Sequence, residues 1–455
     1  MRHIIQPIAV AAVVLTAALL VLPAPPASAA VQGVPVTAGA ITLTAKADYV
    51  TSADGGSILV WGLTNGAGRA QYPGPTLILD QGDTITVTLN NQLAVATSLV
   101  FPGHDVTACT PTPIPAGQMT CQAAAAGSAT YTFTAEQPGT YLYHSGTNAA
   151  LQVELGLLGA IVVRPYGFDP NNPTAYGHPD SAYDREYLFV LSEMDPIIHQ
   201  MVEYGDSFAG TDVLGDYFSK YWFINGRTGP DTMAGNNLSY LPTQPYGSLV
   251  QMIPGEKILM RVVSAGRDLH PFHHHGNHAR VIARNGRMLS SGPGTGFDLS
   301  YEVFTIQAVP GETYDATFEW TGKQMGWDIY GDPTDPIYAH GCTDTIDNTT
   351  GAAGADGFAD PSSDRPWEWC ADHGGAFPVT LPENQDLAFG GFWSGSPFMG
   401  SAEALPPGEG GLNPYAGYTF MWHSHTEKEL TNNDIFPGGM MTMVIVQPPG
   451  TPIVE

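Results

Sequence analysis

The feature that most limits the fold of this chain is an internal repeat of short, mostly apolar or alternating segments. Three pairs of segments match in length and pattern: 77–89 with 251–263, 140–146 with 419–425, and 156–165 with 439–448. In the first pair, an apolar run is followed by a turn that contains Gly82 or Gly255 and then by a second extended run. Side chains that alternate between apolar and polar indicate strands, and two copies of the pattern predict two similar β-domains.

The repeat predicts the organisation of the chain. We expect a first β-domain at 30–166, a polar linker rich in Pro and Asn at 167–184, and a second β-domain at 185–450. The chain has 53 Gly and 38 Pro in 455 residues, which suits a turn-rich β protein with little helix.

The N-terminal residues 1–29 have the positive charge, apolar run and small-residue end of a secretory signal. An uncleaved membrane anchor is the alternative. We therefore expect a secreted or extracytoplasmic protein, in the periplasm or outside the cell, with no membrane contact after signal cleavage. The formal net charge of −27 would repel phosphate backbones, so nucleic acid is excluded as an expected partner.

Export also makes disulfide bonds chemically possible, and the chain has four cysteines. Three pairings exist in principle. Proximity favours Cys109 with Cys121 and Cys342 with Cys370.

Two His-x-His pairs carry the predicted chemistry. On an extended segment, His273 and His275 project to one face, and the same holds for His423 and His425. Imidazole is the commonest metal ligand in proteins, so two such pairs beside apolar segments predict a metal site. A surface histidine cluster or a chance tract is the alternative.

The segments around these pairs resemble the copper motifs of the multicopper oxidases. Three of the family's four motifs are matched by 138–145 ahead of 156–163, by 269–276 (Leu-His-Pro-Phe-His-His-His-Gly), and by 422–425 (Trp-His-Ser-His) ahead of 439–441. The resemblance spans both repeats. It implies an all-β chain of two cupredoxin-like Greek-key β-sandwich or barrel domains, as in two-domain laccase-like and nitrite-reductase-like members. In that family, a blue copper takes electrons from a reductant and a three-copper cluster between domains passes them to O₂.

Carried over position by position, the resemblance implies a set of copper ligands. The third motif contributes one blue-copper imidazole and two cluster ligands, the fourth motif contributes its two flanking histidines, and the second motif keeps one histidine. In this numbering the set is His270, His273, His275, His423, His425 and His144. For His144, which stands alone, a hydrogen-bonded structural residue is the equal alternative.

The family pattern is incomplete here. Ser424 stands at the position of the blue-copper cysteine, and Glu429 stands where the second blue-copper histidine is expected. A serine hydroxyl does not replace a soft thiolate near neutral pH, so we predict no blue copper. In the first domain, Val100 and Pro102 occupy ligand positions of the first motif, and Gly146 occupies one of the second.

Three or four imidazoles suffice for one copper or zinc ion, or for two metal ions bridged by water. The Irving–Williams order and the resemblance favour copper, and the residues leave zinc open as the alternative. The remaining polar residues near these motifs or in loops are expected to be solvated rather than coordinating: His104, His178, His199, His340, His373, Glu427, Glu429 and Asp434. A loop rearrangement that makes His104 a ligand, and a proton relay through the acidic residues, are the less favoured alternatives.

An insertion at about 321–417 enlarges the second domain and is rich in Gly, Pro and Asp. Structureless loops of that length are rare in compact domains, so we expect either a lid or a packed appendage pinned by Cys342 and Cys370. We favour a cover near the metal face, because the insertion runs directly into the strand that carries His423.

Three functions are compatible with these residues. The favoured one is a secreted copper oxidoreductase of the multicopper-oxidase type that uses a small-molecule or metal-ion reductant, with O₂, nitrite or a peroxide as acceptor. The second is a copper-binding or copper-sequestering protein without turnover, and the third is a metal-free scaffold, which the retained His-x-His pairs disfavour. By analogy with two-domain members, which often form trimers, a homotrimer is one possible assembly; if His144 is a ligand, it could then come from a neighbouring subunit.

Overall fold

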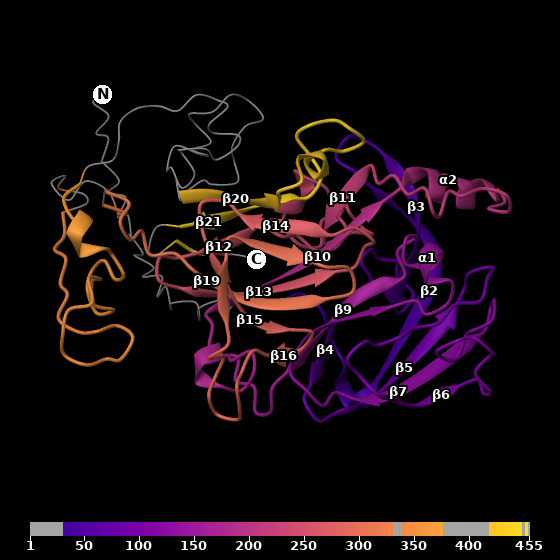
Figure 1. Cartoon of the computed structure of the whole chain (residues 1–455), viewed down its shortest axis with the longest axis horizontal. Helices are drawn as coiled ribbons and strands as arrows, with labels where there is room; N and C mark the ends of the chain where they lie inside the picture. The colour runs from indigo at the N-terminus through magenta and orange to yellow at the C-terminus, as the bar shows by residue number, and fades with distance from the viewer. Residues whose placement is uncertain are drawn as a thin grey trace, which may run out of the picture.

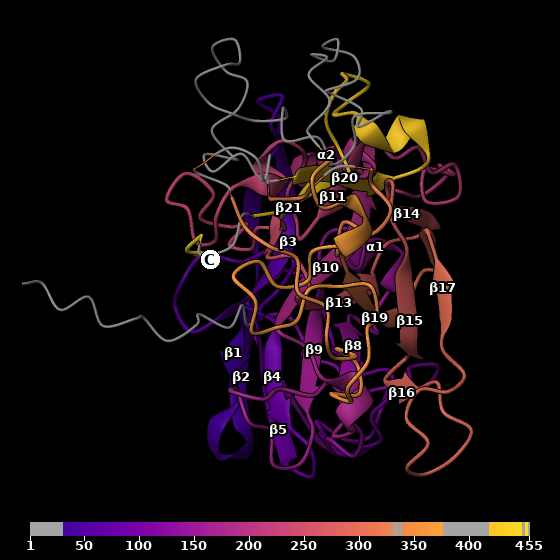
Figure 2. The same cartoon turned by 90° about the vertical axis from the view of Figure 1, so that its left-hand side faces the viewer.

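The computed structural model describes residues 31–326, 328–330, 336, 339–375, 418–447 and 451–453. The expected signal segment and much of the insertion, 376–417, lie outside these residues. Within the described part of the chain, the strands form four sheets, arranged as two pairs that lie side by side (Figures 1 and 2).

The first pair of sheets is built from the N-terminal third of the chain. One sheet has the order β1-β4-β9-β8 and the other has the order β3-β2-β5-β7-β6. Their bounds are β1 Val34–Pro35, β2 Ala40–Thr51, β3 Ser57–Asn65, β4 Leu77–Asp80, β5 Thr84–Asn91, β6 Val106–Thr110, β7 Ser128–Thr134, β8 Gly139–His144 and β9 Leu158–Arg164. In β5, Ile85, Val87 and Leu89 are buried between the sheets while the intervening threonines are more exposed, as the alternation predicts.

The second pair of sheets follows the linker. One sheet has the order β11-β10-β13-β19-β15-β16, with β17 paired to β15, and the other has the order β12-β21-β20-β14-β18. Their bounds are β10 Arg185–Met194, β11 Tyr221–Ile224, β12 Val250–Met252, β13 Lys257–Ser264, β14 His270–His274, β15 Ala279–Arg284, β16 Arg287–Met288, β17 Tyr301–Val303, β18 Thr305–Ala308, β19 Thr313–Glu319, β20 Tyr418–Ser424 and β21 Met441–Val446.

Strand pairing repeats between the two halves in the way the sequence repeat predicts. β4 runs parallel to β9, which is antiparallel to β8, and β12 runs parallel to β21, which is antiparallel to β20. Likewise β5 lies between a parallel and an antiparallel neighbour, and so does β13. The strand that carries His423 is therefore the structural counterpart of the strand that carries His144.

A buried interface joins the two pairs of sheets. Apolar side chains of β3, β8 and β9 form one cluster with side chains of β10, β11 and β13. At its edge, the Glu186 carboxylate accepts hydrogen bonds from Arg164 of β9 and Arg261 of β13, and all three side chains are buried. This buried carboxylate and its two guanidinium partners join β9 of the first half to β10 and β13 of the second.

Helix is sparse, as expected. The described residues contain two α-helices, α1 (Ala149–Gln152) and α2 (Pro196–Tyr204), and a few short 3₁₀ turns. Asp195 caps α2 by accepting from the Ile197 amide, Pro196 occupies the first turn, and Gly205 closes the helix in the left-handed conformation. Among the described residues, no helix has both the length and the apolar character needed to span a bilayer.

Both predicted disulfide bonds are present, Cys109–Cys121 and Cys342–Cys370. The described part of the insertion forms an appendage at the end of the second pair of sheets that lies farther from the first pair (orange in Figure 1). The Tyr418 hydroxyl, at the start of β20, donates to the Ile329 carbonyl at 3.0 Å. This contact lies five residues before His423, so the described part packs at the other end of β20 from the His-x-His pair, and the remainder lies outside the described residues.

Candidate metal centre

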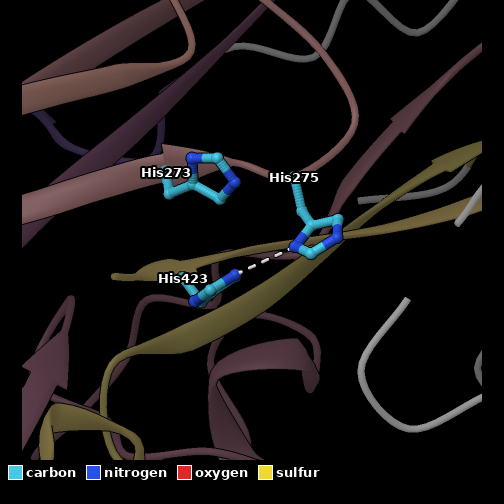
Figure 3. Close-up of side chains that lie close together, drawn as sticks. All are labelled: His273, His275 and His423. Atoms are coloured by element: carbon cyan, nitrogen blue, oxygen red, sulfur yellow. Dashed lines mark hydrogen bonds between the residues drawn. The ribbon is translucent and has the colours of Figure 1, made fainter. Parts of the chain in front are cut away.

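The two His-x-His pairs meet on adjacent antiparallel strands. β14 pairs with β20, and His273 lies directly opposite His423. Because side chains alternate along both strands, His275 falls on the same face, where its Nδ1 lies 3.4 Å from His423 Nε2 (Figure 3). One donor atom from each of these three histidines lies within 4.8 Å of the others.

His425 lies beside this group. Its ring centroid is 4.7 Å from that of His273 and 5.8 Å from that of His423. The side chain is exposed, whereas His273 and His423 are buried. The structure therefore brings four of the six predicted ligands together on one face of one sheet.

Backbone and side-chain partners orient two of the rings. His423 Nδ1 donates to the Ser424 carbonyl at 2.7 Å, which leaves the lone pair of His423 on Nε2, the atom that faces His275. His273 Nδ1 lies 2.9 Å from the Thr305 hydroxyl. A hydrogen bond at the far nitrogen is the usual way in which proteins fix the tautomer of a ligating histidine.

Burial favours the neutral form of three imidazoles on this face, those of His273, His275 and His423. Burial, together with the neighbouring His425 and His275, lowers the pKa of His273 to about 4. Burial likewise lowers the pKa of His423 to about 4, and it lowers the pKa of His275. Neutral imidazoles have the free lone pairs that copper or zinc requires, so the donor set fits such an ion.

His270 lies apart from this face. It is three residues before His273 on the same strand, so alternation turns it to the opposite face, where it is fully buried. Its Nε2 lies 2.8 Å from Glu193 Oε2 and its Nδ1 lies 2.9 Å from Glu429 Oε2. Burial alone would lower the pKa of His270, but the two carboxylates outweigh burial and raise it to about 10. Both nitrogens therefore carry protons and offer no lone pair to a metal.

The residues around His270 occupy the positions expected for blue-copper ligands. Glu429, at the expected second histidine position, is buried against His270 instead of lying in a solvated loop, which corrects the expectation for that residue. Ser424 is buried, and its amide donates to the Met440 carbonyl at 2.9 Å. An imidazole between two carboxylates thus lies at the position where the resemblance implies a blue copper.

His144 also lies apart from the four grouped histidines. It sits at the end of β8, its backbone bridges to Val100, and its Nδ1 lies 3.0 Å from the Ser145 carbonyl. A Cβ atom added to Gly146 would lie 2.7 Å from a Val100 methyl group. The two positions at which the family resemblance places ligands thus face each other, and the Val100 side chain fills the space between them.

Several other histidines differ from the expectation of solvated side chains. His104 lies between the rings of Phe133 and Tyr141, at centroid distances of 4.8 and 4.4 Å, and burial lowers its pKa to about 4. His199 is 1% exposed and its Nε2 lies 3.4 Å from Glu154. For these residues the expectation was wrong, because the loop that carries His104 and the helix α2 that carries His199 pack against aromatic or charged neighbours from distant segments.

His340 and His373 correct the same expectation in another way. They gather with Asp328 and Glu368 in the described part of the insertion, and one donor atom from each residue lies within 4.8 Å of the others. Sequence reasoning missed this group because Asp328 and Glu368 are 40 positions apart. The signal that could have indicated it is the disulfide pair, since His340 precedes Cys342 and Glu368 precedes Cys370 by two residues each.

Comparison with known proteins gives a family match in the first half. A family model described as multicopper oxidase matches residues 60–167. The iron transport multicopper oxidase FET3 of Gibberella zeae is 38% identical over 126 residues, which cover 28% of this chain. The same alignment spans only 18% of the length of that curated relative.

Two solved structures resemble the whole fold. The blue copper oxidase of Nitrosomonas europaea has a TM-score of 0.51 at 16% identity and covers 90% of this chain and 85% of its own. The multicopper oxidase mgLAC has a TM-score of 0.52 at 16% identity and covers 91% of this chain and 88% of its own. The expectation of an all-β, cupredoxin-like fold is confirmed.

Proposed function

We propose that this chain, whose residues 60–167 match the multicopper oxidase family model, is a copper-dependent oxidoreductase with a reduced set of copper sites. The observation that carries the proposal is the convergence of His273, His275 and His423, whose donor atoms lie within 4.8 Å of one another on one face of β14 and β20.

In this proposal, His273, His275 and His423 hold copper, and His425 completes the group from the exposed side. Copper held there supplies one-electron redox chemistry between a reductant and an oxidant such as O₂. The Ser424 carbonyl and the Thr305 hydroxyl hold the rings of His423 and His273, so the donor nitrogens are oriented before an ion arrives. Among the described residues, the exposure of His425 leaves one side of the group open to small molecules.

His270 and His144 are left out of the proposed copper set. His270 is protonated between Glu193 and Glu429, and this charged pair replaces the blue copper that takes up electrons elsewhere in the family. On the first domain's side, the Val100 side chain fills the space beside Gly146. The reductant therefore meets the proposed copper directly at the open face near His425, and the full three-copper cluster is absent from the proposal.

The filled blue-copper position also favours a second candidate function. A copper site without a separate electron-entry centre suits a protein that binds or sequesters copper without turnover. For either function, we propose export through the signal segment at 1–29. We also propose a homotrimer, in which His144 of one subunit would approach the copper face of another. The matched relatives imply copper, and zinc stays the alternative metal.

Copper stoichiometry and O₂ uptake test the proposal together. The full chain is reconstituted with copper and freed of loosely bound ions, and copper is counted by mass spectrometry for the wild type and for His275→Ala/His423→Ala. We expect the double variant to retain about one copper fewer per chain than the wild type. The matched control is His278→Ala, because His278 is exposed, lies beyond the same strand and contacts Phe304 rather than the cluster.

Turnover separates the two functions. Oxygen uptake with a phenolic or metal-ion reductant that disappears in the double variant and persists in His278→Ala supports the oxidoreductase. Copper retention without any uptake would replace it with the sequestering function. A wild-type chain that retains no copper would refute both.

A further inference from the structure

A second group of metal-binding residue types lies in the insertion. Asp328, His340, Glu368 and His373 each place a donor atom within 4.8 Å of the others. The side chains of Asp328, Glu368 and His340 are 0%, 1% and 2% exposed. Two carboxylates and two imidazoles in so enclosed a place form a chemically distinct set from the all-histidine face on β14 and β20.

The distances within the group are those of ligands around a shared ion. His340 Nε2 lies 3.1 and 3.2 Å from the two oxygens of Glu368 and 3.3 Å from Asp328 Oδ2. Ligands about 2.0–2.2 Å from a tetrahedral zinc ion are separated from one another by about 3.3–3.6 Å. A single ring N–H can satisfy only one of these three oxygens, whereas a cation at their centre satisfies all of them.

The hydrogen bonds around the group leave metal-binding atoms of Asp328 and His373 available to an ion. Asp328 Oδ1 accepts from the Tyr330 amide at 2.8 Å, while Oδ2 is buried and makes no well-formed hydrogen bond among the described residues, although it faces His340 Nε2 at 3.3 Å. His373 Nε2 donates to the His340 carbonyl at 3.1 Å, which leaves the lone pair of His373 on Nδ1. A buried carboxylate oxygen without a partner is costly unless a cation or a proton compensates it.

The covalent and backbone connections hold these segments together without a metal. Cys342 and Cys370 join the segment of His340 to that of Glu368. The Asp328 amide donates to the Gly375 carbonyl at 2.8 Å, and the Gly326 amide donates to Asp372 at 3.1 Å. The four donors are thus brought together by contacts that do not involve the donors themselves, which is how preorganised metal sites are built.

We propose that Asp328, His340, Glu368 and His373 bind one zinc ion that fastens the insertion to the second domain. The mixed set of two nitrogens and two oxygens suits zinc better than calcium or magnesium, which prefer oxygen ligands alone. Asp328 lies next to Ile329, whose carbonyl accepts from Tyr418 at the start of β20, so the ion links the insertion to the sheet that carries the copper face. The role is structural and independent of the proposed oxidoreductase activity.

The test uses substitutions to distinguish zinc bound by this group from metal bound at the histidine face. The full chain is prepared as His275→Ala/His423→Ala, stripped with a chelator and titrated with zinc chloride against a chromophoric zinc indicator. We expect about one zinc per chain, and a loss to almost none when Glu368→Gln and His373→Gln are added. Asp364→Asn is the matched control, because Asp364 is an exposed carboxylate of the same insertion.

A second measurement needs no substitution in the group. Limited proteolysis is compared for the chelator-stripped and the zinc-loaded chain. Zinc should slow cleavage within 339–375 about tenfold, because an ion that binds only the folded segment lowers the population of its open, cleavable form. Equal cleavage rates would overturn the proposal. So would zinc content that survives Glu368→Gln/His373→Gln, or a site that takes up copper but not zinc.

Discussion

The buried contact of His270 with Glu193 and Glu429 makes a quantitative prediction about stability. We consider Glu429→Gln, which keeps a side chain of the same shape and a carbonyl that can accept from His270 Nδ1 but removes one negative charge. The imidazolium then keeps only Glu193 as a charged partner. Breaking a buried pair in this way costs about 3–5 kcal/mol of unfolding free energy.

The pH dependence follows from the raised pKa of His270. The ordinary pKa is 6.5 and the folded value is about 10, a difference of about 3.5 that corresponds to at most about 5 kcal/mol. A raised pKa stabilises the folded state fully below the unfolded pKa, and the contribution is lost as the pH rises through the folded pKa. The deficit of Glu429→Gln should therefore be largest below pH 6.5 and should shrink as the pH approaches 10.

Urea unfolding at a series of pH values between these limits measures the deficit. Subtracting the unfolding free energy of the variant from that of the wild type at each pH cancels the contributions of titratable groups that both proteins share. Glu427→Gln serves as the control, because Glu427 is an exposed carboxylate of the same turn. A deficit that stays constant across the series, or one no larger than that of Glu427→Gln, would refute the assignment of a protonated His270.

Three further predictions follow from the same structure. Ser424→Cys, loaded with copper, should develop no intense blue absorbance band, because Glu429 still occupies the second imidazole position; a strong band would contradict the placement of the fourth motif. Glu186→Gln should cost about 3 kcal/mol in urea unfolding at neutral pH. Burial alone would raise the pKa of Glu186, but two guanidinium groups lower it to about 2. The loss of unfolding free energy should therefore persist above the ordinary pKa of 4.5 and fade as the pH drops through 2. A loss that does not change with pH in the same assay would count against the ion pair. Gly146→Ala should cost about 1–3 kcal/mol, because its new methyl group meets Val100, and the double variant with Val100→Ala should recover most of that loss in thermal unfolding; no recovery would mean that Val100 does not fill the space beside Gly146.

Some features of this protein follow from the sequence because they depend only on local geometry. The alternation of side chains along a strand predicts that His273 and His275 share a face, and the structure has them there. The repeat of 77–89 in 251–263 predicts the repeated strand pairing for the same reason. Close spacing sufficed to predict both disulfide bonds.

The alternation of side chains along the strand also predicts that His270 lies on the opposite face from His273, although the copper motif groups the two residues together. His270 lies an odd number of residues from His273, so a continuous strand must turn it to the other face. The resemblance to a copper motif placed it with the metal ligands. The partners that hold it, Glu193 and Glu429, come from segments far away in the chain.

The tertiary structure alone decided which polar groups became partners. His340 and Glu368 are 28 positions apart, and no periodic pattern relates them, but the folded insertion brings them within 3.1 Å. Val100 fills the space beside Gly146 because two loops pack together, which neither segment specifies alone. Local pattern fixes the face to which a side chain points, whereas the groups that meet it there depend on the packing of distant segments.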